Sequence, residues 1–247
     1  MKIVVIGAGA AGLLAAGKAA ETADEVVIIE KNDIIGKKLL ITGKGRCNIT
    51  NSADIEDMIG QYPRNAKFLY SALYTFTNDD IIRIIEENGV KTKVERGGRV
   101  FPVSDKSQDV VKALKKYAFK PNVSLVHDTV KSLIISGGTV KGVKTSKTSI
   151  TADRVIICTG GKSYPRTGST GDGYKFAKQA GHTIIEPKAS LIPVLTEEKF
   201  VKDIMGLSLR NIKITAFNQK NKKVYSDFGE MLFTHFGISG PVVLSDR

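Results

Sequence analysis

The sequence contains no tryptophan, only two cysteines and only three histidines among 247 residues. Cys47 and Cys158 are far apart and form no Cys-x-x-Cys pair, which excludes a disulfide framework and favours a reducing compartment. His127, His182 and His235 show no metal-ligand spacing, so we expect no metal site. The scarcity of these residues therefore argues against secreted disulfide-rich proteins and zinc proteins.

Long hydrophobic runs are also missing. No apolar stretch approaches the roughly 20 residues that a membrane-spanning helix needs. Met1 and Lys2 lead straight into a predicted strand without the pattern of a signal peptide. With 42% hydrophobic residues, the composition is that of an ordinary globular protein of one large or two modest domains. We expect a cytoplasmic protein that makes no membrane contact.

Charge is the one compositional excess. The formal net charge is +12, from 37 basic and 25 acidic residues. The lysines are scattered, and no stretch combines a basic block with stacking aromatic residues, which makes nucleic acid an unlikely partner. A solvated basic surface that attracts anionic cofactors and a small-molecule substrate is the favoured interpretation.

The first 30 residues carry the strongest motif. Residues 2–6 (KIVVI) have the β-branched, apolar character of a buried parallel strand, and the glycine-rich run GAGAAG follows at residues 7–12. An alanine-rich helix is predicted over residues 13–22, and a second strand over residues 25–29 ends at Glu30. This is the arrangement of a dinucleotide-binding βαβ unit.

Each part of this motif has a physical role in holding a dinucleotide. Gly7 permits the tight turn, Gly9 lets a diphosphate approach the backbone, and Gly12 lets helix and strand pack closely. The helix N-terminus offers amide donors to the phosphates, and Glu30 can accept from ribose hydroxyls. An acidic rather than a basic residue at position 30 favours FAD or NAD over NADP, and the motif alone does not separate those two.

A basic, glycine-containing loop follows over residues 36–51 (GKKLLITGKGRCNITN). Its glycines free backbone amides, and Arg46 adds a fixed charge, a combination that suits a diphosphate or a flavin edge. The apolar residues 39–41 inside the loop argue against a plain surface loop.

This loop resembles the signature of a bacterial flavoprotein family. The family is that of the YhiN/BaiN-like NAD(P)/FAD-dependent oxidoreductases, which include bile-acid reductases and aminoacetone oxidases. Three more stretches match it in order: GRVFPVS at 98–104, TGGKSYP at 159–165 with TGSTGDG at 167–173, and FTHFGISGP at 233–241. The resemblance implies that the cofactor is FAD, with NAD(P)H as a candidate co-substrate.

Between the motifs, residues 53–120 are predicted to be mostly helical. Phe68, Leu69 and Phe76 fall at helical spacing, so we expect the aromatic residues of this segment, Tyr70 and Tyr74 included, to belong to the core. A helix beginning near Thr77, a hairpin over residues 90–101 and an amphipathic helix over residues 105–118 follow.

The remainder of the first domain is predicted to be strand-rich. Residues 124–127 form another parallel strand, and the resemblance implies a backbone contact to adenine at residues 128–130. A β-meander over residues 130–151 precedes a strand at 154–158, where a plain NAD dehydrogenase would have a helical crossover. A glycine-flanked helix start at residues 168–173 is expected to face the flavin side of the cofactor.

From about Pro187 the pattern changes to strands at 190–195, 211–217 and 223–228. We expect a β-rich substrate domain, with residues 233–241 returning toward the cofactor. The chain ends at residues 245–247 directly after an apolar run, and the resemblance implies that family members continue well past this point. A fragment of a longer protein is therefore expected.

The sequence thus predicts an α/β protein with a doubly wound parallel sheet, an inserted β-meander and part of a second domain, divided as 1–187 and 188–247. His235 is the candidate acid or base. The predicted function is FAD-dependent hydride transfer with a small organic substrate. The alternatives are an NAD-dependent dehydrogenase, a tRNA-modifying flavoprotein and a catalytically incomplete fragment. The predicted cofactor-binding residues are Gly7, Ala8, Gly9, Ala10, Ala11, Gly12, Glu30, Lys31, Lys37, Lys38, Leu39, Gly43, Gly45, Arg46, Cys47, Asn48, Val130, Thr159, Gly160, Gly161 and Gly171.

Overall fold

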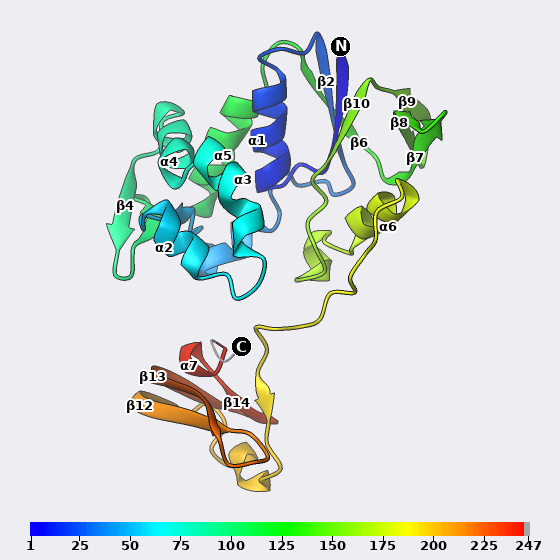
Figure 1. Cartoon of the computed structure of the whole chain (residues 1–247). Helices are drawn as coiled ribbons and strands as arrows, with labels where there is room; N and C mark the ends of the chain where they lie inside the picture. The colour runs from blue at the N-terminus through cyan, green and yellow to red at the C-terminus, as the bar shows by residue number, and fades with distance from the viewer. Residues whose placement is uncertain (245–247) are drawn as a thin grey trace. The chain divides into compact units, whose positions relative to one another are not determined.

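A computed structural model describes residues 1–244 of the chain (Figure 1). The chain separates into two compact units, Met1–Ile184 (unit 1) and Ile185–Arg247 (unit 2). The chain end at 245–247, for which the sequence predicted no closing element, lies outside the described residues. Each unit is described by itself.

The centre of unit 1 is a four-stranded parallel sheet. Its strands are β1 (Lys2–Ile6), β2 (Glu25–Glu30), β6 (Val123–His127) and β10 (Arg154–Ile157), in the spatial order β10-β1-β2-β6. All three pairings are parallel. The chain crosses from one side of β1 to the other between β6 and β10, so the sheet has a switch point beside β1, where open α/β sheets bind ligands.

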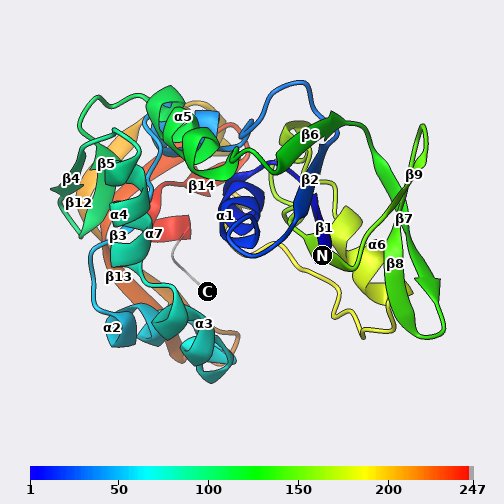
Figure 2. The same cartoon turned by 90° about the horizontal axis from the view of Figure 1, so that it is seen from above.

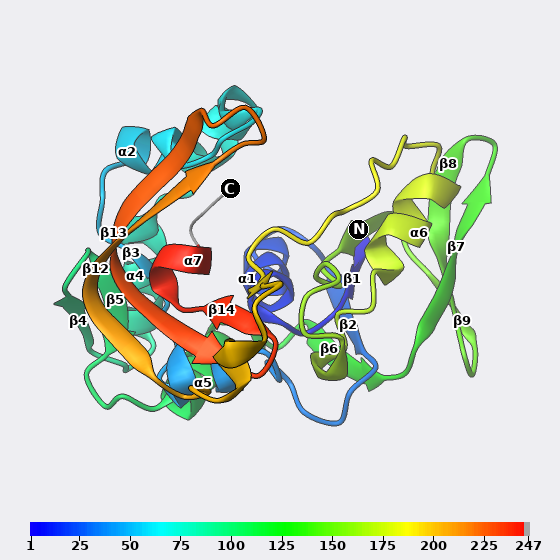
Figure 3. The same ribbon diagram turned by 90° about the horizontal axis from the view of Figure 1, so that it is seen from below.

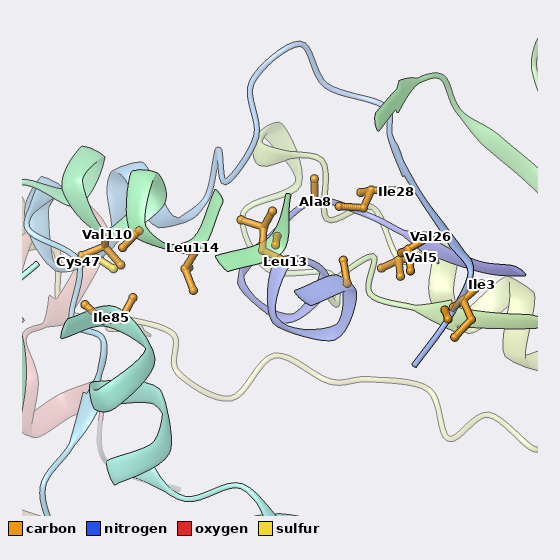
Figure 4. Close-up of a cluster of buried hydrophobic side chains, with 14 residues drawn as sticks. Ile3, Val5, Ala8, Leu13, Val26, Ile28, Cys47, Ile85, Val110 and Leu114 are labelled. Atoms are coloured by element: carbon orange, nitrogen blue, oxygen red, sulfur yellow. The ribbon is translucent and has the colours of Figure 1, made fainter. Parts of the chain in front are cut away.

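The alternation of side chains along the strands divides the core into two clusters. Ile3, Val5, Val26 and Ile28 point to one face, where they pack with Leu13 and other residues of the helices (Figure 4). The opposite face carries its own buried cluster, centred on Val4, Ile6, Val27 and Ile29. Because both faces are covered, β1 and β2 read as continuous apolar runs in the sequence.

Helices cover the first face. Helix α1 (Ala10–Ala19) packs on the sheet and against α5 (Ser107–Ala118), which also contacts α4 (Asn78–Glu87) (Figure 2). Helix α1 begins three residues before the predicted start, because the alanines and Gly12 of the glycine motif already form its first turn. A reciprocal capping box between Thr77 and Asp80 starts α4, as the sequence predicted.

The second face is covered by the β-meander and one helix. The meander comprises β7 (Val130–Ser136), β8 (Thr139–Thr145) and β9 (Ser149–Thr151), and the helix is α6 (Asp172–Gln179). Leu133, Val143 and Phe176 from these elements pack on the sheet. The predicted β-meander insertion in an α/β fold is therefore confirmed.

The connection from β2 to α5 contains the smaller elements of unit 1. They are η1 (Leu39–Gly45), β3 (Thr50–Asn51), α2 (Ile55–Gly60), η2 (Ala66–Leu69), α3 (Tyr70–Thr75), β4 (Thr92–Glu95) and β5 (Arg99–Pro102). A later 3-10 turn, η3, covers Pro165–Thr167. Strands β3, β5 and β4 form a small antiparallel sheet, and the β4–β5 hairpin was predicted.

The prediction that the aromatic residues near α3 belong to the core is wrong. Phe68 is 86% exposed, and Tyr70, Tyr74 and Phe76 are also exposed. The segment folds as two short helices that pack on α2 and on each other, so there is no second layer to cover the rings. Helical spacing predicts that the rings lie on one face of a helix. It does not predict whether another element packs on that face.

Unit 2 is an antiparallel sheet. Its elements are β11 (Val194–Leu195), η4 (Lys199–Lys202), β12 (Ser208–Phe217), β13 (Lys223–Thr234), β14 (Gly237–Ser239) and α7 (Pro241–Leu244), with the strand order β11-β14-β13-β12. Strands β12 and β13 form a long hairpin (Figure 3). The β-rich character was predicted, whereas β11 is much shorter than the expected strand at 190–195. Within residues 1–244, no helix has the length and apolarity needed to cross a bilayer.

The turn between β6 and β7 is built around the buried carboxylate of Asp128. Its oxygens accept hydrogen bonds from the backbone amides of Thr129 (2.7 Å) and Lys147 (3.2 Å). The Thr145 side chain, and then these amides, lower the pKa of Asp128 to about 2 against the opposing effect of desolvation. The charged form of Asp128 therefore fixes the start of the meander.

Asp128→Asn is expected to destabilise the protein at neutral pH, because one of the two amides then faces an amide nitrogen. The folded-state pKa lies below the ordinary value of 3.8, so the stabilisation is present above about pH 4 and is lost as the pH falls through about 2. Urea unfolding at pH values from 7 to 2 measures the free energy of unfolding of both proteins. The difference between variant and wild type should shrink as the pH falls from about 4 to about 2. Asp33→Asn, at an exposed position, is the control. A difference in unfolding free energy between Asp128→Asn and wild type that does not change with pH would contradict the prediction.

Candidate functional site

A pocket opens at the carboxyl ends of β1, β2 and β10, at the switch point of the sheet. Its wall combines the glycine turn after β1, the end of β2 with the loop that follows, the start of β7, and the segments after β10. The lining residues include Gly7, Ala8, Gly9, Ala10, Ala11, Glu30, Lys31, Lys37, Lys38, Leu39, Val130, Thr159 and Gly160, all of which were predicted from the sequence.

The glycine turn has the shape that the motif predicted. Gly7 has a positive φ of 104°, and a Cβ there would lie 2.5 Å from the carbonyl oxygen of Cys158. A Cβ on Gly12 would overlap the carbonyl oxygen of Gly7. In contrast, no atom lies within 4 Å of the position that a Cβ on Gly9 would take. Gly7 and Gly12 are thus required by packing, whereas the space beside Gly9 is open for a ligand.

The N-terminus of α1 faces this open space. Gly9 is the N-cap residue and has no side chain with which to cap the helix, and the first turn carries no acidic residue. The amides of Ala10 and Ala11 lie in the pocket wall. Uncapped amides and the positive end of the helix dipole are suited to a diphosphate.

Glu30 closes the second strand and is only 7% exposed. One carboxylate oxygen accepts the backbone amide of Ala8 at 2.7 Å. The other accepts the backbone and side-chain amides of Asn32, at 2.8 and 2.6 Å. The carboxylate is therefore held in the pocket wall by three donors, which leaves about one of its four acceptor sites for a ligand.

The loop after β2 crosses to the segment that follows β10. The ammonium group of Lys38 donates to the carbonyl oxygen of Ser163 at 2.8 Å, and burial lowers the pKa of Lys38. The amide of Gly36 donates to the carbonyl of Ala8 at 2.9 Å, which ties the same loop to the glycine turn. Lys38 and its neighbour Lys37 thus supply positive charge to the pocket wall.

The segment 167–172, within the glycine-rich run whose helix start was expected to face the cofactor, forms a further part of the wall. Lys31 donates to Thr170 at 2.8 Å and pairs with Asp172 at 2.7 Å. Desolvation raises the pKa of Asp172, but the hydrogen bonds from Lys31 and Thr170 lower it, and the net shift is downward. These contacts hold the segment against the end of β2.

Sequence reasoning missed several lining residues. Among them are Asn32, Ile34, Thr42, Thr167, Ser169 and Phe176. The glycine-rich run at 168–173 was a usable signal for this part of the wall. Asn32 and Phe176 gave none, because their positions depend on the fold of segments far apart in the sequence.

Eight predicted cofactor contacts do not line this pocket: Gly12, Gly43, Gly45, Arg46, Cys47, Asn48, Gly161 and Gly171. Arg46 is the most informative. Its guanidinium pairs with Glu95 at 2.9 Å and Asp105 at 3.3 Å, and lies 4.0 Å from the centroid of the Phe101 ring. The hydrogen bond to Glu95 raises the pKa of Arg46 despite the opposing effect of desolvation. In this structure, Arg46 joins η1 to the β4–β5 hairpin.

The remaining candidates are a histidine and two cysteines. His235 is an exposed residue of unit 2, in the turn between β13 and β14, with its ring edge-on to Phe236 at 4.7 Å. Burial raises the pKa of both Cys47 and Cys158. Cys158 lies in the pocket wall as a small apolar residue. Among residues 1–244, no cluster of potential ligands that could hold a metal ion is found.

The residues present fit a dinucleotide that has a free ribose 2′-hydroxyl. The space beside Gly9 is open, the start of α1 is uncapped, and the buried carboxylate of Glu30 ends the second strand, which are the features that a dinucleotide-binding βαβ unit requires. Lys37 and Lys38 offset the negative charge of such a ligand.

Comparison with known proteins gives the family. The model of the HI0933-like protein Rossmann domain matches residues 1–240. The ribosomal RNA dihydrouridine synthase of Haemophilus influenzae is 35% identical over 98% of this chain and 59% of its own length. The 3-dehydro-bile acid delta(4,6)-reductase of Clostridium scindens is 33% identical over 97% of this chain and 58% of its own length. The chain therefore spans slightly less than three fifths of these relatives.

Solved structures support the fold. An open conformation of a flavocytochrome c3 fumarate reductase aligns with a TM-score of 0.60, at 16% identity, over 85% of this chain and 47% of the other. Sdh1 of Mycobacterium smegmatis aligns with a TM-score of 0.55, at 21% identity, over 72% of this chain and 38% of the other. The chain belongs to the HI0933-like protein Rossmann-domain family, in agreement with the resemblance of its sequence motifs.

Proposed function

We propose that the pocket of unit 1 binds FAD and that the protein reduces a carbon–carbon double bond conjugated to a carbonyl group, with uridine in RNA as the substrate. The observation that carries the cofactor assignment is the wall formed by the glycine turn, the uncapped α1 and the buried Glu30. The family supports FAD as the dinucleotide.

The side chains and amides of this chain would bind and orient the cofactor. The amides at Gly9, Ala10 and Ala11 would hold the diphosphate, and Glu30 would accept from a ribose hydroxyl. Lys37 and Lys38 would balance the charge of the diphosphate or of the flavin end. Bound FAD would supply the hydride, and the protein contributes position and electrostatics.

The names of the relatives support the reaction class. Formation of dihydrouridine adds two hydrogens to the ring double bond of uridine, which is conjugated to a carbonyl. A delta(4,6)-reductase of a 3-dehydro bile acid reduces a double bond conjugated to the 3-keto group. Both reactions need a hydride at one carbon and a proton at the other, so one type of flavin site serves both substrates.

The net charge of +12 supports RNA over a small organic molecule. A polyanion gains from a basic surface through release of its counterions, whereas a neutral substrate does not. This choice reverses the preference for small molecules that the scattered lysines suggested. The supporting observation is that two curated relatives, at 35% and 31% identity, share the name ribosomal RNA dihydrouridine synthase.

A small conjugated ketone is the second candidate substrate, favoured by the 33% identity to the bile-acid reductase. NADH or NADPH is the proposed source of electrons for either substrate.

The purified protein is expected to release FAD on denaturation and to show a flavin spectrum that bleaches anaerobically with NADH or NADPH. Addition of a uridine-rich RNA should then restore the oxidised spectrum, and each converted uridine should gain the mass of two hydrogens. Restoration by a conjugated ketone alone would select the second candidate. A protein that holds NAD but no flavin would overturn the proposal.

Gly9→Ala tests the diphosphate position. The backbone of Gly9 (φ −81°, ψ −169°) accommodates alanine, so thermal unfolding of the apoprotein should not change. The added Cβ would occupy the ligand side, and we expect FAD affinity to fall by about tenfold or more, a loss of about 1.4 kcal/mol. Gly60→Ala, at another glycine with open surroundings, is the matched control. Wild-type FAD affinity in Gly9→Ala would refute this position.

Glu30→Gln tests the ribose position. The substitution removes a charged acceptor that serves both the wall and the proposed ribose, so the dissociation constant of FAD should rise by about 10-fold to 150-fold, or 1.5–3 kcal/mol. Fluorescence titration with FAD measures it. Glu25→Gln, on the same strand with an exposed side chain, should bind like the wild type. Equal binding by both variants would exclude Glu30 as a ligand.

A further inference from the structure

Residues 61–76, which include η2 and α3, form an exposed aromatic segment. Phe68 is 86% exposed, and Tyr62, Tyr70, Tyr74 and Phe76 are between 42% and 51% exposed. The segment lies beside α2 at the edge of unit 1 (Figure 2). Five of the protein's 17 phenylalanine and tyrosine residues are thus gathered on one short surface segment.

Such exposure is costly unless the rings have a use. Burial of an aromatic ring stabilises a fold, and an exposed ring such as Phe68 forgoes that stabilisation. The short helices η2 and α3 pack on α2 and on each other, so their rings are not packed against the main core of unit 1. A cluster of exposed apolar residues of this kind marks an interaction surface.

Two of the rings are already arranged in parallel. The Tyr70 and Tyr74 rings lie 5.8 Å apart with an interplanar angle of 13°. They are four residues apart on α3, and the hydroxyl of Tyr74 donates to Glu56 at 3.1 Å. The backbone and this hydrogen bond therefore hold ring faces in a stacking geometry before any partner binds.

The charges of the segment select the partner. Between Met58 and Asn78 the sequence has no aspartate or glutamate, and its only charged residues are Arg64 and Lys67, both exposed. The acidic residues of the adjoining helix α2 precede this stretch: Tyr74 donates to Glu56, Asp54 caps the helix by accepting the amide of Asp57, and Asp57 lies in its first turn. Exposed rings interleaved with cations are the combination by which proteins hold single-stranded nucleic acid, with bases on the rings and phosphates on the cations.

We propose that the aromatic segment docks single-stranded RNA, with bases stacked on Phe68 and Tyr70 and the backbone phosphates near Arg64 and Lys67. The inference rests on the proposed function for the choice of RNA as substrate class, and it adds a binding surface that is separate from the FAD pocket. Phe68 is the principal ring because it is the most exposed. The flat, parallel faces of Tyr70 and Tyr74 suit bases better than lipid chains.

The absence of tryptophan provides a specific reporter. Phe68→Trp would introduce the only tryptophan in the chain, and its emission should be quenched when a uridine-rich oligoribonucleotide stacks on it. Inorganic polyphosphate, which has charge but no bases, should leave the emission unchanged. A response to anionic lipid vesicles instead of RNA, or emission that depends on protein concentration alone, would overturn the proposal in favour of a membrane or a second copy of the chain.

Affinity provides the second measurement. Phe68→Ala and Tyr70→Ala should each weaken binding of a labelled oligoribonucleotide by about 5-fold to 150-fold, the range for losing one stacked base. Phe217→Ala, at a 60% exposed ring in unit 2, is the matched control and should bind normally. Thermal unfolding should be unchanged in all three variants, because the rings are exposed.

The outcomes separate this inference from the proposed reaction. RNA binding that is equally tight in wild type and both segment variants would overturn the docking surface and leave uridine reduction standing. Binding that depends on Phe68, in a protein that does not reduce uridine, would support the surface and overturn the reaction. Failure of the wild-type protein to bind the oligoribonucleotide would overturn the docking surface directly.

Discussion

The hydrogen bond from the amide of Ala8 to the carboxylate of Glu30 is the contact on which the site of this protein depends. It joins the glycine turn after β1 to the last residue of β2 across 2.7 Å. Asn32 donates twice to the other carboxylate oxygen, so one buried side chain sets both the turn and the loop that leaves β2. A buried carboxylate without such donors would be strongly unfavourable, which is why the charge and the turn geometry are coupled.

The two covered faces of the parallel sheet explain why this contact lies at an open edge. Helices α1 and α5 cover one face, and the β-meander with α6 covers the other, so only the strand ends remain for a ligand. The glycine turn, Glu30 and Thr159 lie at the carboxyl ends of three neighbouring strands of that sheet. Segment 167–172 is drawn to the same edge by the ion pair between Lys31 and Asp172.

Basic residues serve different purposes in different parts of unit 1. Lys31 and Lys38 hold segments of the pocket wall together. Arg46, which resembles a cofactor ligand in sequence, is neutralised by Glu95 and Asp105 and stacks on Phe101. Arg64 and Lys67 lie on the exposed segment 61–76, which itself contains no acidic residue. The basic residues are thus divided between those in structural ion pairs and those that remain as surface charge, and only the second kind attracts a polyanion.

The sequence by itself determined the parallel strands, the βαβ turn, the meander and the glycine and glutamate positions, because these depend on local steric rules and on apolar periodicity. Only the tertiary structure decided which side chains share a wall. It directed Arg46 to Glu95, 49 residues away, and brought Asn32 beside Thr167. It also left Phe68 in solvent, since helical spacing defines a face but not what packs on it. Long-range partners depend on how distant segments meet, and no local pattern encodes that meeting.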